Sequence, residues 1–175
     1  MRLFPRRPRP RRRVRPGTRR ALLAAAAVAV LSATGCAGPS PKGPAVPSPS
    51  GAVAADCRAL AGLLPAELAG QARVEREPVS VFTAVWGDPG IELRCGVPRP
   101  RPLTPGSEHY NPTADAVEVN GVSWLLEERE DGYRFTTTGR SAFVELTVPG
   151  AYAPEINALT ALAEPVGRAV PERPL

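Results

Sequence analysis

The sequence predicts an α+β fold, an antiparallel sheet of about five or six strands with N- and C-terminal helices packed on one face. Apolar residues recur at helical spacing only near the ends of residues 56–172, and alternation with a period of two dominates between them. Asn-Gly and Asp-Gly pairs separate neighbouring strands and favour tight hairpins. The 22 prolines exclude an all-helical chain, and the 43% hydrophobic content excludes a wholly disordered one.

The first helix is predicted directly after Asp56, because aspartate is favoured at the N-cap position. The helix spans the sequence CRALAGLL and ends at Pro65, since proline cannot continue a helix. A second helical turn is predicted for residues 66–69. The apolar side chains of the first helix share one face and form its buried stripe: Cys57, Leu60, Leu63 and Leu64.

Six segments of the middle region have the pattern of a strand, and the sixth is the least certain to join the sheet. The first is apolar on both faces, as in a central strand, and the second alternates cleanly. Turns are expected at residues 87–90, Asn120-Gly121 and Asp131-Gly132, and the proline-rich segment Pro98–Asp115 is expected to be a long loop. The segments are Val79–Trp86, Ile91–Val97, Ala116–Val119, Val122–Glu128, Tyr133–Thr138 and Ala142–Val148.

The second helix is predicted over Pro154–Val170. Pro165 should kink this helix or divide it near Glu164, because its ring removes a hydrogen bond and crowds the preceding turn. The apolar residues that share one face of the helix are Ile156, Leu159, Leu162 or Ala163, Val166 and Val170.

The charge of the chain is divided between two regions. Ten of the arginines lie within residues 1–20, whereas the first acidic residue is Asp56. The formal net charge of +5 therefore combines about +10 from the N-terminal segment with −5 from Cys36 onward, where 12 basic residues face 17 acidic ones. The basic segment leads into the uncharged, mostly apolar run Ala21–Ala33. A DNA-binding arm does not normally lead into such a run, so we expect no nucleic-acid partner.

Residues 1–35 are predicted to be a secretory signal peptide. A basic segment, an apolar run of 13 residues and small residues before a cleavage site form this pattern. The apolar run is short for a transmembrane helix, which needs roughly 20 residues, although an uncleaved signal anchor is the alternative. Arg19-Arg20 followed by Leu22-Leu23 resembles a twin-arginine signal, and the abundance of arginine leaves the general export route equally open.

Residues 33–36, Ala-Thr-Gly-Cys, resemble the lipobox of bacterial lipoproteins, with Ala33 where leucine is usual. The resemblance implies that Cys36 becomes the first mature residue and carries acyl chains; the alternative is a cleavage site at which this cysteine is incidental. Residues 36–55 are expected to combine the lipidated cysteine with a Pro/Ser/Ala/Gly tether. Such a tether reaches roughly 25 Å as a coil and about 60 Å when extended.

Cys57 and Cys95 both occupy positions predicted to face the core. In an exported protein this arrangement predicts a disulfide, with two buried free thiols as the alternative. Two cysteines and the distant His109 make a poor ligand set, so we expect no metal and no cofactor.

No motif of a common enzyme class occurs in the sequence. Ser107, His109 and Asp115 could form a triad only on paper, because they lie in one loop without rigid support. The acidic run at residues 127–131 is expected to be a solvated hairpin tip. Four residues are candidates for ligand or partner contact, with a core or ion-pairing role as the alternative for each: Trp86, Asp88, Arg94 and Arg140.

Five short motifs together resemble an uncharacterised actinobacterial family of exported proteins that is known only as a domain of unknown function. They are Asp56-Cys57 with Leu64-Pro65, Trp86-Gly-Asp-Pro89, Leu93-Arg-Cys-Gly-Val97, Val119-Asn-Gly-Val-x-Trp124 and Thr138-Gly-Arg140. The resemblance covers about residues 55–172. It implies an exported domain, often lipid-anchored, with paired cysteines, and it implies no catalytic residues.

We therefore expect a lipoprotein on the outer face of the cytoplasmic membrane, with residues 56–172 as a single non-catalytic binding or scaffold domain. Its expected partners are the membrane, through the lipid anchor, and proteins or wall material of the cell envelope. An extracytoplasmic enzyme acting on cell-wall material is the alternative function. A secreted protein is the alternative location if Cys36 is not acylated.

Overall fold

The computed structural model describes residues 42–173, so the expected signal peptide and Cys36 lie outside the described residues. Within that range the helices are α1 (Gly51–Ala61) and α2 (Asn157–Ala169), with short 3₁₀ turns η1 (Arg101–Leu103) and η2 (Gly150–Tyr152). The strands are β1 (Glu67–Leu68), β2 (Gln71–Val74), β3 (Thr83–Trp86), β4 (Ile91–Cys95), β5 (Ala116–Val119), β6 (Val122–Arg129), β7 (Gly132–Thr137) and β8 (Val144–Val148).

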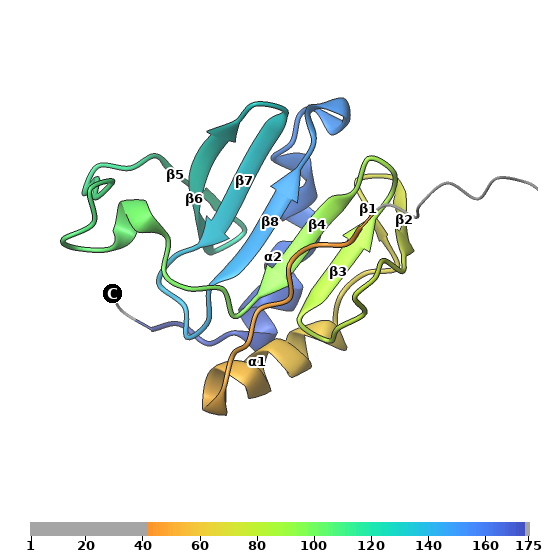
Figure 1. Cartoon of the computed structure of the whole chain (residues 1–175), viewed down its shortest axis with the longest axis horizontal. Coiled ribbons are helices and arrows are strands. Elements are labelled where there is room, and N and C mark those ends of the chain that lie inside the picture. The colour runs from red at the N-terminus through yellow and green to blue at the C-terminus, as the bar shows by residue number, and fades with distance from the viewer. Residues whose placement is uncertain (1–41, 174–175) are drawn as a thin grey trace, which may run out of the picture. The chain divides into compact units, whose positions relative to one another are not determined.

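The α+β class is confirmed, and the sheet is larger than expected. Eight strands of the described region form one antiparallel sheet in the order β1-β2-β3-β4-β8-β7-β6-β5. Two meanders thus run inward from opposite edges and meet where β4 pairs with β8 (Figure 1). This central pairing sets Leu93 opposite Leu146 and Arg94 opposite Glu145, a pair separated by 51 residues in the chain.

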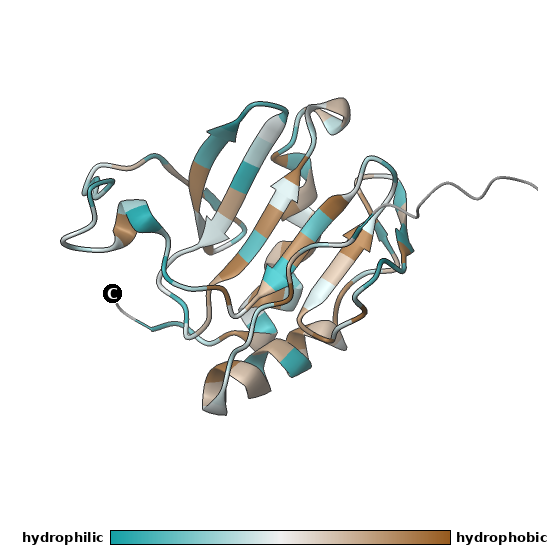
Figure 2. Ribbon diagram, viewed as in Figure 1, coloured by the Kyte–Doolittle hydropathy of each residue, from teal (hydrophilic) through white to brown (hydrophobic). Residues whose placement is uncertain are grey.

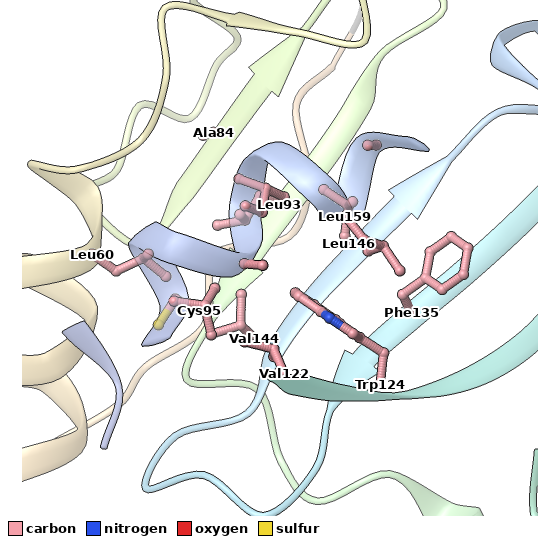
Figure 3. Close-up of a cluster of buried hydrophobic side chains, with 14 of the residues drawn as sticks. Leu60, Ala84, Leu93, Cys95, Val122, Trp124, Phe135, Val144, Leu146 and Leu159 are labelled. Atoms are coloured by element: carbon pink, nitrogen blue, oxygen red, sulfur yellow. The ribbon is translucent and has the colours of Figure 1, made fainter. Parts of the chain in front are cut away.

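Both helices contribute to the core that covers one face of the sheet. In Figure 1 α2 lies behind the sheet, where it contacts β5, β6 and α1. Figure 3 shows Trp124, Phe135 and Leu146 from three adjacent strands gathered close to Leu159 of α2. All four side chains are buried. The sheet and the two helices therefore enclose a single apolar layer.

The expected disulfide between Cys57 and Cys95 is present and links α1 to β4, with the two Cα atoms 5.6 Å apart. Both cysteines are 1% exposed, so the bond lies inside the core. It joins residues that are 38 positions apart in the chain. The disulfide thereby ties the N-terminal helix to the centre of the sheet.

The N-terminal helix begins earlier than expected, at Gly51 rather than after Asp56. The segment from Gly51 to Ala55 is rich in alanine, which has the highest helix propensity, and Ser50 precedes it in an extended N-cap conformation. Asp56 lies inside the helix, and its carboxylate accepts a hydrogen bond of 2.6 Å from the Ser141 hydroxyl. Asp56 is therefore not an N-cap and instead links α1 to the segment before β8.

Residues 42–50 cross the sheet in extended form, and we call them the N-terminal strap. The Gly43 amide donates to the Glu77 carbonyl at 2.8 Å, and the Ala45 carbonyl accepts a 2.8 Å hydrogen bond from Arg94 Nε. Pro44 and Pro47 of the strap are buried. Residues 42–55 were expected to be part of a tether, but here they pack on the folded domain, because α1 and β4 offer partners that composition does not reveal.

Other expectations need correction at element boundaries. Residues 66–69 do not form a helical turn, since Glu67–Leu68 is strand β1, which pairs with β2. The strand expected from Val79 begins only at Thr83, because residues 80–83 make a turn that the Ser80 side chain supports by accepting a hydrogen bond from the Phe82 amide. The hairpin between β6 and β7 turns at residues 130–131 rather than at Asp131-Gly132, because Gly132 is already paired with Arg129.

The remaining elements follow the prediction in part: the second helix begins at Asn157 rather than Pro154, which leaves Ile156 40% exposed instead of on the buried face. Strand β5 has the predicted bounds, and residues 98–115 form a long loop without a strand. Helix α2 continues through Pro165, so the expected division near Glu164 is wrong. Leu162 and Val166 are fully buried on either side of the proline, and their packing holds the helix together despite the missing hydrogen bond.

Candidate binding face

The second face of the sheet carries a cluster of charged residues beside the buried side chains of Val85 and Leu125, and the strap crosses it at Arg94. It is the strongest candidate for a functional surface. Successive residues of a strand point to opposite faces, so the residues between the core positions of β4, β6, β7 and β8 share this second face. Figure 2 shows the resulting alternation of hydrophilic and hydrophobic bands along these strands. The charged residues that share it, here called the charged face, are Glu92, Arg94, Glu127, Arg134 and Glu145.

A continuous chain of ion pairs crosses the charged face. Arg94 donates a 2.9 Å hydrogen bond to Glu145, and Arg134 makes two hydrogen bonds of 2.8 and 3.0 Å to the two oxygens of Glu127. A longer contact of 3.9 Å joins Arg134 to Glu145. The side chain of Glu145 is 12% exposed and that of Arg134 29% exposed. These charges are therefore partly desolvated, which strengthens their interaction relative to pairs in open solvent.

Two groups of the charged face have shifted pKa values. Burial raises the pKa of Glu92 above its ordinary value, and the nearby Arg94 opposes this shift while Glu145 adds to it. The hydrogen bonds that Arg134 donates to Glu127 raise the pKa of Arg134, against the opposing effect of burial. The face carries three carboxylates and two guanidinium groups, so its formal charge is −1. Within residues 42–173, Glu92 is the one of these three carboxylates that accepts no hydrogen bond from an arginine.

One end of the charged face is hollowed beneath the loop of residues 98–115. The hollow measures about 560 Å³ and has Glu127 and Arg134 on the sheet side. Arg101 and His109 line it from the loop, together with two prolines, Pro100 and Pro102. The loop holds its shape through internal bonds, including one of 2.9 Å from the Asn111 amide to the Pro102 carbonyl. The hollow therefore combines acidic and basic groups from the sheet and from the loop.

Two of the four candidate residues lie outside the charged face at the turn after β3. Trp86 is 0% exposed in the core, and its indole nitrogen donates a 3.0 Å hydrogen bond to the Pro65 carbonyl. It therefore cannot form a ligand-contacting rim. Asp88 is on the surface with its side chain 73% exposed, and it contacts Arg76 at 3.6 Å.

Arg94 and Arg140, the other two candidates, have different surroundings. Arg94 belongs to the charged face. The side chain of Arg140 is only 7% exposed, and it donates to the carbonyls of Val170 and Gly121 at 3.2 and 2.8 Å. Arg140 therefore fastens the C-terminal segment to the β5–β6 turn. The structure does not bring the four candidates together.

The loop residues that could form a triad only on paper do not form one. The Ser107 hydroxyl oxygen accepts a hydrogen bond from the His109 backbone amide, and His109 and Asp115 are exposed. Among the described residues, no group of three or more His, Cys, Asp or Glu side chains is arranged to hold a metal ion. Glu127, which was expected to belong to a solvated hairpin tip, is instead paired on the charged face.

Sequence reasoning missed Glu92, Glu127, Arg134 and Glu145 as a group. The signal was present in the strand sequences IELRC and VELTV, where charged residues alternate with apolar ones. Such alternation predicts a polar outer face, but it does not identify the strand that lies next to it. The pairing of β4 with β8 supplied the missing information.

The arrangement suits recognition of charged groups better than proton transfer. Glu127 and Glu145 already accept hydrogen bonds from the guanidinium groups of Arg134 and Arg94, which use part of their acceptor capacity. A general base needs a lone pair directed at the proton that it removes. A partner with complementary charges can instead bind to the rim without breaking the pairs below.

The fold and this face define a class: a disulfide-bonded α+β domain with one sheet face closed by two helices and the other charged. Residues 20–175 match the family described as "Protein of unknown function (DUF3515)", and the chain belongs to that family. Membership of a family of unknown function, as the motifs indicated, is therefore confirmed. No curated protein and no solved structure matches the chain.

Proposed function

We propose that this protein is an exported lipoprotein, anchored through acyl chains on Cys36, whose folded domain binds a partner of the cell envelope. The observation that supports a binding role is the charged face. The partner is wall material or an envelope protein that brings a basic group to Glu92 and an acidic group to Arg101 in the hollow. The domain acts as a binding or scaffold module.

The core disulfide and the leader segment support export. A buried disulfide forms and persists in oxidising compartments, and it is rare in cytosolic proteins. The basic and apolar segments before Cys36 have the composition of a signal peptide. Neither α1 nor α2 has the length and apolarity that a bilayer crossing requires. The proposed attachment is through acyl chains on Cys36, of which two or three are needed for stable anchoring.

The ion-pair chain on the charged face supports binding. Partial burial of a charged group is costly unless the group is paired and hydrogen-bonded, as these charges are. Complementary charges across an interface chiefly set specificity and association rate. The excess carboxylate at Glu92 and the exposed guanidinium of Arg101 provide groups of both signs for a partner.

Acyl-chain labelling in cells tests the anchor. The wild-type protein should incorporate a labelled fatty acid and remain in the membrane fraction, whereas Cys36→Ser should lose the label and leave that fraction. Unlabelled wild-type protein, or unchanged membrane partitioning of the variant, would exclude the lipoprotein proposal.

Site-specific photo-crosslinking in intact cells tests the binding face. A photoreactive residue in place of His109, which lines the hollow together with Arg101, should capture a defined partner. The matched control replaces Arg168, which lies on the outer side of α2 with its side chain 65% exposed. Equal capture at both positions would show that the charged face is not the binding surface.

A further inference from the structure

We propose that the loop between β2 and β3, residues 75–82, rests on the membrane surface and inserts Val79 and Val81 among the lipids. This inference rests on the lipid anchor at Cys36 proposed above. It adds an orientation: the domain is held against the bilayer by this loop and is not raised above it on a long tether.

The length of chain between the anchor and the folded domain carries the argument. Among the described residues, the first that bonds to the rest of the domain is Gly43, so at most residues 37–42 separate that contact from Cys36. Seven Cα–Cα steps from Cys36 to Gly43 span at most about 25 Å. A tether that extended to residue 55 would reach about 60 Å. The point at which the strap begins must therefore stay close to the lipid headgroups.

The loop of residues 75–82 lies next to the start of the strap. The Gly43 amide donates its 2.8 Å hydrogen bond to the Glu77 carbonyl of this loop. Pro44 and Val79 line the same small hollow. The end of the strap that leads to the anchor therefore lies beside this loop. If that end is held near the bilayer, the loop is held near it as well.

Two of the most exposed large apolar side chains in the described region belong to this loop. Val79 is 63% exposed and Val81 is 56% exposed. Single exposed valines are common on protein surfaces and need no explanation. Here two of them lie in one loop beside the only covalent connection to the proposed anchor. The bilayer into which the acyl chains on Cys36 insert offers these two side chains an apolar environment.

The charges near this loop nearly cancel. The positive charges are those of Lys42, Arg58, Arg73 and Arg76, and the negative ones those of Glu75, Glu77 and Asp88, which leaves a net charge of +1. A bilayer contact made here should depend on the apolar side chains rather than on attraction to anionic lipids.

Tryptophan fluorescence of the acylated full-length mature protein tests the inference. The native Trp86 and Trp124 are both 0% exposed and give a constant background. The variants are Val79→Trp and, as a matched control, Tyr110→Trp, at a 46% exposed position in the loop that leads to the opposite edge of the sheet. Each variant is reconstituted into phosphatidylcholine vesicles whose acyl chains carry bromine, with iodide as the quencher in water.

The added tryptophan at position 79 should lose emission to the brominated lipid and be shielded from iodide, and the one at position 110 should behave in the opposite way. Adding phosphatidylglycerol should leave both results unchanged. Equal lipid quenching at the two positions overturns the inference. Shielding from iodide without lipid quenching also overturns it, because protein would then cover the loop.

Intact mass separates this result from the anchor proposal. If the mass shows acyl chains on the N-terminal peptide and position 79 is not quenched by lipid, the inference fails while the anchor stands. If the mass shows no acyl chains, both fail together. A requirement for phosphatidylglycerol would overturn the apolar contact and leave the anchor intact.

Discussion

The two faces of the sheet are made by alternate residues of the same strands and yet are packed in different ways. In β8, Val144, Leu146 and Val148 are 0% exposed beneath the helices, whereas Glu145 and Thr147 point to the charged face. The first face is closed by apolar contact, which requires no particular partner group. The second is held by directed hydrogen bonds between named groups.

This difference separates stability from recognition within a single sheet. Apolar burial contributes in proportion to the area removed from water and cannot tolerate a cavity. Half-buried ion pairs contribute little net stability, because desolvation offsets much of their attraction. We therefore expect substitutions on the core face to change the free energy of unfolding strongly, and those on the charged face to change it weakly and to affect binding instead.

The largest expected effect contrasts two neighbours in β8. Leu146→Ala should lower the free energy of unfolding by about 2–5 kcal/mol, because it removes buried methyl groups and leaves a cavity. Thr147→Ala, one residue further on the charged face, should cost less than about 1 kcal/mol. Urea denaturation followed by circular dichroism measures both. Similar losses for the two variants would erase the distinction between the faces.

Removal of the disulfide should have the next largest effect. Replacing both Cys57 and Cys95 by alanine should destabilise the domain by about 2–4 kcal/mol, because the unfolded chain gains freedom. Reductant should weaken the wild-type protein by a comparable amount and leave the double variant unchanged. A reductant effect on the double variant would point to a cause other than this bond.

A smaller effect is expected when the shared carboxylate of the charged face is removed. Glu145→Ala should cost about 1 kcal/mol, since Arg94 and Arg134 both lose a half-buried partner. The control is Glu164→Ala, which breaks an exposed i,i+4 pair with Arg168 and should cost only about 0.3 kcal/mol. Thermal melts at low and high salt compare the two. Equal losses of stability in the two variants would show that the ion pairs of the charged face are no stronger than an ordinary exposed pair.

The smallest effect is the pH dependence due to Glu92. Its pKa is raised in the folded state, so the folded protein holds the proton more tightly and the contribution of Glu92 to stability declines as pH rises above about 4.5, its ordinary value. Glu92→Gln cannot ionise and should lose less stability than the wild type between pH 4 and about 7. Parallel stability curves for the two proteins over that range would contradict the assigned cause.

Local patterns predicted the elements whose information lies within a few residues. The strand patterns of AVEV and VSWLLEE and the Asn120-Gly121 turn predicted a hairpin that the structure contains, with Asn120 and Gly121 both at positive φ. The core-facing positions of Cys57 and Cys95 predicted the disulfide. The extra strands β1 and β2 were missed, because two and four residues are too few to establish a period.

The sequence by itself determined the class of fold, the charge division and the alternation that makes one face of each strand apolar. It did so because side-chain direction follows from the period of the backbone. Only the tertiary structure decided that Trp86 is buried, that Arg140 holds the C-terminal segment, and that the strap packs on β4. It also brought Arg94 to Glu145 across 51 residues. Such contacts depend on which strands become neighbours, and no local periodicity encodes that choice.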